Sequence, residues 1–488
     1  MSQPRKIGRR GFVKYAGAGV TAAAIAGVAY YAKDSWLPYL EGLQKPSKPT
    51  PTGPTPTGPT PTGPIPTTLK KVAFDYSPKF QYMLMDPELA AKEGVKFTNM
   101  TEYEGEPKPE VEWSLDSQTV SHDWNYSTKL IPGKHSVTLT ARDGKTSEWA
   151  GVDIEVDEYG PDYPKKKLKV PIKGIVYTTA VVQEFYQMPP TEDQMKEHLF
   201  VIKNELGCNG IRITGDIDEI SYKCAEMAID LGYECIVLSP FWINYTPEDT
   251  VSRMVYFSKD AEKLREKHDG VLLNLVEEPS TTPRGILDDS PSWKVRTGMI
   301  PQKYKDPRWH KRYQKFLEDL IDASKHFNGK RLIGFGSWEW ETAEWRDLDI
   351  EIVGDSHYWY PNYGDWSNPN NSYITHMNSV RVFGKPYYIT EWGSCTYKGA
   401  WERGADAWRD AMSMSAPYNE EEQVNAIERY AQMFNNANKV DAIFLFEFWT
   451  NQSFPYAPLM YEIIKPEHSN SWSRKKAFHM YKSYVKGS

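Results

Sequence analysis

The sequence predicts an α/β protein in which a (β/α)8 barrel follows a small all-β sandwich. From about residue 170 onward, short apolar runs alternate with amphipathic helical segments, which is the pattern of successive βα units. Eight such runs can be counted, and none is followed by the glycine-rich phosphate loop of a doubly wound sheet. Before residue 165, apolar and polar residues alternate instead with a period of two, as in half-buried antiparallel strands.

The length and charge of the chain limit its organisation and its partners. At roughly 150 residues per domain, 488 residues predict several units rather than one. A hydrophobic content of 40% indicates that most of the chain folds. The net charge of -7 provides no positive field for a phosphate backbone, so we expect no nucleic acid partner.

Residues 1–32 are interpreted as an export signal or membrane anchor. The paired Arg9 and Arg10 precede an uncharged run rich in Ala, Gly and Val, and together they resemble the twin-arginine export signal. The run of about 18 uncharged residues lies at the lower limit of a membrane span, so cleavage and retention as an anchor both stay open. We therefore expect an extracellular protein, secreted or attached at its N-terminus to the outer face of the membrane.

Residues 33–68 are predicted to form a Pro/Thr-rich stalk. Three copies of Pro-Thr-Pro-Thr-Gly occupy 49–63. Proline at this density favours an extended polyproline conformation, which acts as a semi-rigid spacer.

Residues 69–165 are predicted to form the sandwich. The expected strands lie at 95–98, 111–115, 135–141 and 150–156. The run from Ile131 to Gly144, with Trp113 upstream, resembles an immunoglobulin-like or PKD-type repeat. Because no carboxylate pair or His cluster stands out there, a spacer or a weak sugar-binding module is the expected role.

Residues 166–488 are predicted to form the barrel, which is also called a TIM barrel, as the catalytic domain. The eight expected strands lie at 173–177, 210–214, 234–238, 271–275, 331–335, 350–354, 386–390 and 442–446. Helices are expected at 192–206, 221–231, 249–267, 308–326 and 420–438. Such a barrel carries its chemistry at the carboxyl ends of its strands.

The four cysteines indicate neither a disulfide scaffold nor a metal site. None of them forms a Cys-x-x-Cys pair, and no strand ends in His-x-His. Buried free thiols are the expected state, with one bridge between Cys208 and Cys235 left open. We expect no metal and no cofactor.

Two predicted strands end in glutamates that carry a family resemblance. The fourth strand ends in Glu277-Glu278-Pro279 and the seventh in Glu391-Trp392-Gly393. These motifs resemble those of retaining glycoside hydrolases on this barrel, glycoside hydrolase family 5 and its relatives, which include cellulases and mannanases. The resemblance implies that Glu278 is the acid/base and Glu391 the nucleophile of a two-glutamate double displacement.

The resemblance also assigns residues around this pair, and together with Trp392 they are expected to bind substrate. Arg212 on the second strand matches an arginine that hydrogen-bonds the nucleophile and keeps it ionised. His357 and Tyr358 match a His-x-Tyr motif after the sixth strand, although Tyr360 is also available for the contact with Glu391. Trp449 after the eighth strand corresponds to an aromatic platform beneath the sugar.

The fourth strand departs from the family pattern, because Glu277 stands where the family has an Asn that binds a sugar hydroxyl. Neighbouring strand residues point to opposite faces, so only one of Glu277 and Glu278 is expected to face the cleft. Glu278 is the choice because Pro279 fixes the register, and a role in binding substrate is left to Glu277.

The tryptophans predict the kind of substrate. Flat aromatic rings stack on sugar C–H faces, so Trp residues after predicted strands suggest several subsites and a polysaccharide of β-glucan or mannan type. We expect about half of ten such tryptophans to line the cleft. They are Trp242, Trp293, Trp338, Trp340, Trp345, Trp359, Trp366, Trp392, Trp401 and Trp449. A monomer is expected. The alternative is a catalytically inactive barrel that binds carbohydrate at the cell surface.

Overall fold

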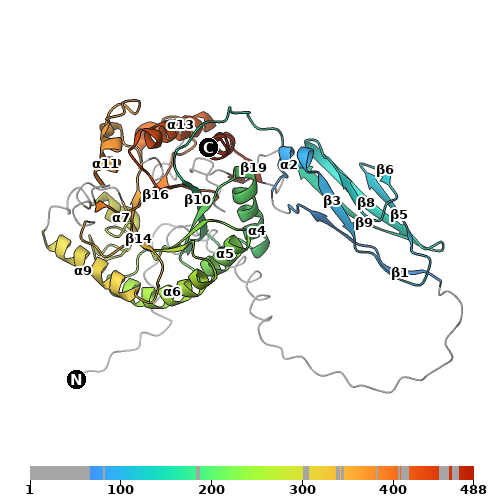
Figure 1. Cartoon of the computed structure of the whole chain (residues 1–488), viewed down its shortest axis with the longest axis horizontal. Helices are drawn as coiled ribbons and strands as arrows, with labels where there is room; N and C mark the ends of the chain where they lie inside the picture. The colour runs from blue at the N-terminus through green and yellow to red at the C-terminus, as the bar shows by residue number, and fades with distance from the viewer. Residues whose placement is uncertain are drawn as a thin grey trace, which may run out of the picture. The chain divides into compact units, whose positions relative to one another are not determined.

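The computed structural model describes most of the chain after the stalk (Figure 1). The described residues are 66–80, 83–182, 187–299, 307–336, 341, 346–380, 383–404, 407, 417–449, 461–463 and 472–487. The expected export segment and the stalk up to residue 65 lie outside them. Within these ranges, no helix combines the length and the apolar character that crossing a membrane requires.

Eight parallel strands close into a barrel, as the sequence predicted. In order they are β10 (Ile172–Ala180), β11 (Gly210–Gly215), β12 (Cys235–Pro240), β13 (Val271–Glu277), β14 (Arg331–Phe335), β15 (Ile352–Ser356), β16 (Tyr387–Trp392) and β17 (Ala442–Leu445). β10 pairs with both β11 and β17, which closes the ring.

Helices surround this ring (Figure 1). They include α4 (Glu192–Phe200), which continues as a π-helix over Val201–Leu206, α5 (Asp218–Asp230), α6 (Pro247–Lys267), α7 (Trp293–Gly298), α9 (Pro307–Ala323), α11 (Ser372–Val380), α13 (Glu420–Asn436) and α14 (Lys476–Val485). The side chains of Ile211, Leu273 and Ile389 alternate outward and form one core with the helices. Val176, Leu272 and Phe444 point inward and fill the barrel.

Two strands depart from regular alternation near their carboxyl ends. Asn274 of β13 pairs with Leu332 of β14, and Glu277 pairs with Gly334. Two residues of β13 therefore lie between these pairs where β14 has one, so β13 carries one extra residue. A second register shift follows Ile389 in β16. Such bulges re-aim side chains, and both of these lie at glutamates singled out from the sequence.

The N-terminal part contains two antiparallel sheets that share one core. One sheet has the order β2-β3-β7 (Phe74–Ser77, Val95–Asn99, Tyr126–Thr128), and the other has the order β6-β5-β8-β9 (Gln118–Ser121, Glu110–Leu115, Gly133–Arg142, Ser147–Val156). A two-stranded sheet of β1 (Thr68–Lys71) and β4 (Glu102–Glu104), and the short helix α2 (Pro87–Lys92), complete this part. Trp113 of β5 is fully buried and packs on Phe74 and Phe97 of the facing sheet. The immunoglobulin-like or PKD-type assignment stays a prediction.

A buried arginine links this part to the barrel. Arg474, which precedes α14, is fully buried, and its Nη2 lies 2.6 Å from Glu205 Oε2 on the barrel side. Its Nη1 lies 3.1 Å from Asp157 Oδ2, directly after β9. Since an isolated buried charge is costly, these contacts hold the two parts together in one compact unit of residues 65–488.

The four cysteines are buried and free, as expected from the sequence. The bridge between Cys208 and Cys235 that the sequence left open is absent.

Candidate active site

Arg212 is the centre of the polar cluster at the carboxyl end of the barrel. It points inward from β11, is fully buried, and pairs with two glutamates. Its Nη1 lies 2.7 Å from Glu391 Oε1, and its Nη2 lies 2.7 Å from Glu277 Oε2. Both nitrogens donate at charge-assisted hydrogen-bond distance, so one guanidinium orients both carboxylates.

Glu277 is enclosed by donors and has no acceptor capacity left for a substrate. Its Oε2 also accepts from Asn274 Nδ2 at 2.7 Å. Its Oε1 accepts from the hydroxyls of Ser356 and Thr390. With four donors on two oxygens and a side chain only 1% exposed, Glu277 supports Arg212 from below the site. The expectation that Glu277 binds substrate is therefore not met.

Gly334 on β14 provides the space for this buried carboxyl. A Cβ on Gly334 would lie 1.9 Å from Glu277 Oε2, far inside van der Waals contact. Position 334 therefore requires glycine, because the β13 bulge turns the Glu277 side chain into the space that a Cβ would occupy.

Glu278 reaches the mouth while Glu277 lies below it, but simple alternation along β13 does not explain this placement. The β13 bulge places Leu275 and Val276 together in the outer core and turns Glu277 inward. Glu278 then leaves the strand with a φ of 45°, a left-handed conformation that is unusual for a glutamate. Alternation no longer applies across a bulge followed by such a turn.

The loop after Glu278 is braced from α7. Arg296 is fully buried and donates to the carbonyls of Thr281 and Thr282 at 2.6 and 2.9 Å. The amide groups of the same two threonines bond back to the Glu278 carbonyl. This network holds the Glu278 backbone in its strained conformation.

Burial and neighbouring charges raise the pKa values of both Glu278 and Glu277. Burial, and after it the charges of Glu391, Glu277 and Glu341, raise the pKa of Glu278 to about 8. Among the described residues, the Thr281 hydroxyl is the side chain that bonds to it, at 3.3 Å from Oε2. Burial also raises the pKa of Glu277 to about 7, against the opposing charge of Arg212. At neutral pH Glu278 therefore carries a proton that it can give up.

Glu391 is held by two donors and stays partly open. The β16 bulge puts Thr390 and Glu391 on the inner side together, and Glu391 Oε1 meets Arg212. Tyr358 donates its hydroxyl to Oε2 at 3.0 Å, which shows that Tyr358 rather than Tyr360 makes this contact. The Glu391 side chain is 13% exposed, whereas that of Glu277 is 1% exposed. Glu391 is thus the Arg212-bound carboxylate that a ligand can reach.

His357 and Trp392 lie behind the site rather than in it. Both flank inward residues, and strand alternation turns them outward. His357 is fully buried against Tyr373 of α11, with ring centroids 3.8 Å apart. Trp392 is 1% exposed and packs on Tyr430 of α13. The substrate-binding roles expected for these two residues are therefore not supported by their placement.

Trp449 also lies outside the barrel mouth. It is 1% exposed, donates its indole N–H to the Thr178 carbonyl at 2.9 Å and packs against His198 of α4. Phe446 instead continues the inward positions of β17 and is partly exposed at the inner core. Phe446, two positions beyond Phe444, is thus a partly exposed aromatic ring directly after β17.

Half of the ten tryptophans considered for the cleft are packing residues. Trp338, Trp340 and Trp345 lie outside the described residues. Five of the other seven are buried at 3% exposure or less, and the expectation that about half of the ten line the cleft stays a prediction: Trp242, Trp359, Trp392, Trp401 and Trp449. Trp293 and Trp366 are partly exposed.

Two further carboxyls belong to this end of the barrel and were missed from the sequence. Glu447 follows β17, accepts a hydrogen bond from Thr178 at 2.5 Å, and has its pKa raised to about 8 by burial and then by Glu391. Glu341 accepts from Tyr313 at 3.0 Å, and burial raises its pKa to about 7. Glu447 directly follows the apolar run at 442–446, and a carboxylate at the end of a predicted strand was the sequence signal that could have identified it.

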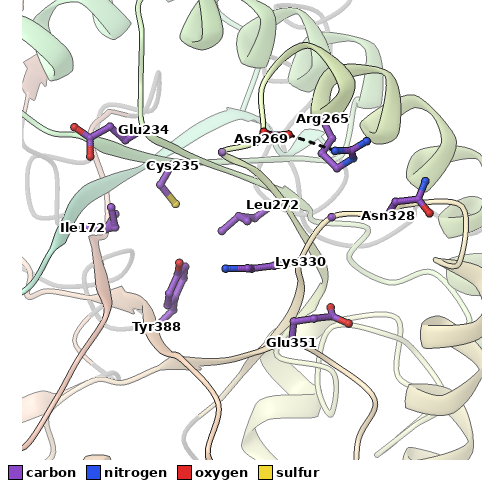
Figure 2. A pocket seen from close by; sticks show the side chains of 12 residues that line it. Ile172, Glu234, Cys235, Arg265, Asp269, Leu272, Asn328, Lys330, Glu351 and Tyr388 are labelled. Atoms are coloured by element: carbon purple, nitrogen blue, oxygen red, sulfur yellow. Dashed lines mark hydrogen bonds and ion pairs between the residues drawn. The ribbon is translucent and has the colours of Figure 1, made fainter.

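A separate cavity of about 490 Å³ lies at the opposite end of the barrel (Figure 2). It is lined by residues at the amino ends of strands, among them Ile172, Leu272 and Lys330. That end of such barrels contributes to stability rather than chemistry. None of the glutamates described above lines this cavity.

Comparisons with known proteins give distant structural neighbours. No known family profile matches the sequence, and no curated protein sequence is significantly similar. Among solved structures, a GH113 β-1,4-mannanase is 13% identical, with a TM-score of 0.43, over 66% of this chain and 99% of that chain. The β-D-glucuronidase of Dictyoglomus thermophilum is 12% identical, with a TM-score of 0.41, over 80% of this chain and 65% of that chain. The β-glucuronidase of Parabacteroides merdae is 11% identical, with a TM-score of 0.41, over 86% and 52% of the respective chains. These neighbours are glycoside hydrolases, and the likeness to family 5 stays a prediction.

Proposed function

We propose that the protein is a retaining glycoside hydrolase that acts on a β-linked glycan. One observation carries the proposal. Two carboxyls share the barrel mouth in different surroundings: burial raises the pKa of Glu278, whereas Glu391 accepts a hydrogen bond from a buried arginine. Double displacement needs such a pair, one acid and one ionised nucleophile.

The residues then divide the reaction between them. Glu391 would attack the anomeric carbon while Glu278 gives its proton to the departing glycosidic oxygen, so the C–O bond breaks and a glycosyl ester forms. Glu278, now ionised, would take a proton from water, and the hydroxide would release the sugar from Glu391 with overall retention. Tyr358 and Arg212 would orient Glu391 in both steps.

The substrate class is proposed from the acidic and aromatic mouth. A β-glucan or a mannan carries no charge, so the carboxyl groups of the mouth would not repel it. Phe446, which is partly exposed beside Glu447, would offer an apolar ring to a sugar face. Secretion or attachment to the outer surface remains part of the proposal because a polysaccharide is met outside the cell.

Hydrolysis of a panel of purified β-glycans tests the proposal. Wild-type protein should release reducing sugar from one class, and Glu391→Gln should lose this activity while keeping the folded structure. NMR of the first-formed product should show the β-anomer, because retention follows from two inversions. If no glycan or aryl β-glycoside is cleaved but one is bound, the protein is the carbohydrate-binding alternative instead.

A further inference from the structure

Three side chains with metal-binding atoms converge on the outer face of β15, away from the barrel mouth. Asp355 lies on the strand, His357 follows two positions later on the same face, and His376 comes from α11. Asp355 Oδ2 lies 3.2 Å from His376 Nε2 and 3.5 Å from His357 Nδ1. All three ligand atoms lie within 4.8 Å of one another.

The spacing of these atoms fits a shared metal ion. A Zn–N or Zn–O bond of about 2.0–2.1 Å with tetrahedral angles separates neighbouring ligand atoms by about 3.3 Å. The two distances to Asp355 Oδ2, 3.2 and 3.5 Å, lie on either side of that value. The longer one exceeds the usual range of an N–H···O hydrogen bond, so a direct bond explains it less well.

The surroundings supply the outer contacts that metal ligands need. The other ring nitrogen of His357, Nε2, lies 3.4 Å from the Tyr373 carbonyl. Tyr387 donates its hydroxyl to Asp355 Oδ2 at 2.5 Å. A carbonyl behind a histidine and a donor on the carboxylate are the contacts that orient ligands in metal sites.

The burial of the three groups agrees with this arrangement. Asp355 and His357 are fully buried, whereas the His376 side chain is 12% exposed. The edge at His376 gives an ion a route from solvent and leaves a further coordination position for water.

We propose that Asp355, His357 and His376 bind one divalent transition metal ion of the zinc type. Two imidazoles and one carboxylate form a ligand set that suits zinc and its neighbours rather than magnesium or calcium. The sequence-based expectation of no metal rested on the lack of His-x-His, whereas this set combines Asp-x-His with a distant helix.

The site is structural and separate from the chemistry at the mouth. Ser356 and Tyr358 alternate with its ligands and point inward to Glu277 and Glu391. Bound metal would join β15 to α11 and thereby steady the strand end that carries Tyr358. This proposal stands whether or not the barrel hydrolyses glycans.

Metal content and thermal unfolding of the full chain test the proposal. After chelation and dialysis against zinc, wild-type protein should hold one zinc per chain, and its Tm should exceed that of the apo form by several degrees. His376→Gln should lower zinc affinity at least tenfold and remove the Tm shift. The exposed His326 provides a matched control, because His326→Gln should behave as wild type. Cobalt in place of zinc should give the visible d–d bands of a four-coordinate site.

Two results would overturn the proposal. The first is wild-type protein that holds no zinc after dialysis against zinc and unfolds at the same temperature as the chelated form. This comparison does not depend on whether the variant folds well, because the wild-type Tm shift alone decides it. The second is zinc binding that His376→Gln and His357→Gln leave unchanged.

Discussion

Replacing Glu278 by Gln tests the assignment of the acid directly. Gln keeps the size of the side chain but cannot donate a proton to a leaving group. At a pKa of about 8, roughly 90% of Glu278 is protonated at pH 7, whereas an ordinary glutamate at 4.5 would be protonated to roughly 0.3%. The structure therefore supplies about a 300-fold larger population of the working acid at neutral pH.

The expected loss depends on the leaving group. General acid catalysis contributes about 10²- to 10⁴-fold, so Glu278→Gln should slow alkyl and sugar leaving groups by about that factor. Glycosylation by dinitrophenyl glycosides should fall less than about tenfold, because their leaving group needs no proton. In the wild type, kcat/KM should decline as pH rises through about 8, since the raised pKa makes the protonated form the active one below it. That alkaline limb should vanish in Glu278→Gln.

The assay is a series of aryl glycosides of increasing leaving-group pKa, with Glu277→Gln as the matched control. Glu277 is buried with four donors, so its variant should lower activity evenly across the series through Arg212. If Glu277→Gln instead shows the leaving-group dependence and Glu278→Gln does not, the assignment of the acid is wrong. The inference that Glu277 is closed to substrate because four donors enclose it would then also be wrong.

Four further variants test other parts of the structure. Glu391→Ala should abolish turnover of natural substrates, and added azide should restore cleavage of an activated substrate as the α-glycosyl azide; no rescue and retained turnover would refute its role. Tyr358→Phe should lower kcat about tenfold with little change in Tm, because it removes only the 3.0 Å bond to Glu391; an unchanged kcat contradicts this. Gly334→Ala should lower both Tm and kcat, because its Cβ would lie 1.9 Å from Glu277, whereas Gly298→Ala, with open space around it, should do neither. Glu447→Gln should gain about 4 kcal/mol of stability over wild type between pH 5 and pH 9, measured by urea unfolding. The raised pKa of Glu447 makes wild type lose stability as pH rises from about 5 to about 8, where the loss levels off; equal pH profiles would contradict this.

The sequence by itself predicted the barrel architecture and the residues of its polar cluster. Eight apolar runs separated by amphipathic segments predicted the closed barrel, because each buried parallel strand needs continuous apolar residues. A polar cluster at one end of that barrel was predicted from the glutamates that end the fourth and seventh runs and from Arg212 on the second. The structure brings Arg212, Glu277 and Glu391 together as salt-bridged partners.

Only the tertiary structure decided which side chains face the mouth. A bulge adds one residue to β13 and another shifts the register of β16, and each changes the face of every residue after it. Periodicity in the sequence does not mark which residue is the extra one. Glu277 therefore points inward against simple alternation, and Glu278 reaches the mouth through a left-handed turn.

The same limit applies to residues that meet across the chain. Phe446 and Glu447 were overlooked in favour of Trp449, since an isolated tryptophan looks the same in sequence whether it lines a cleft or packs on a helix. Asp355 and His376 meet only because β15 and α11 pack together. Strand faces and such long-range contacts depend on how the whole barrel closes, because hydrogen-bond register and packing are properties of neighbouring strands and not of any one segment.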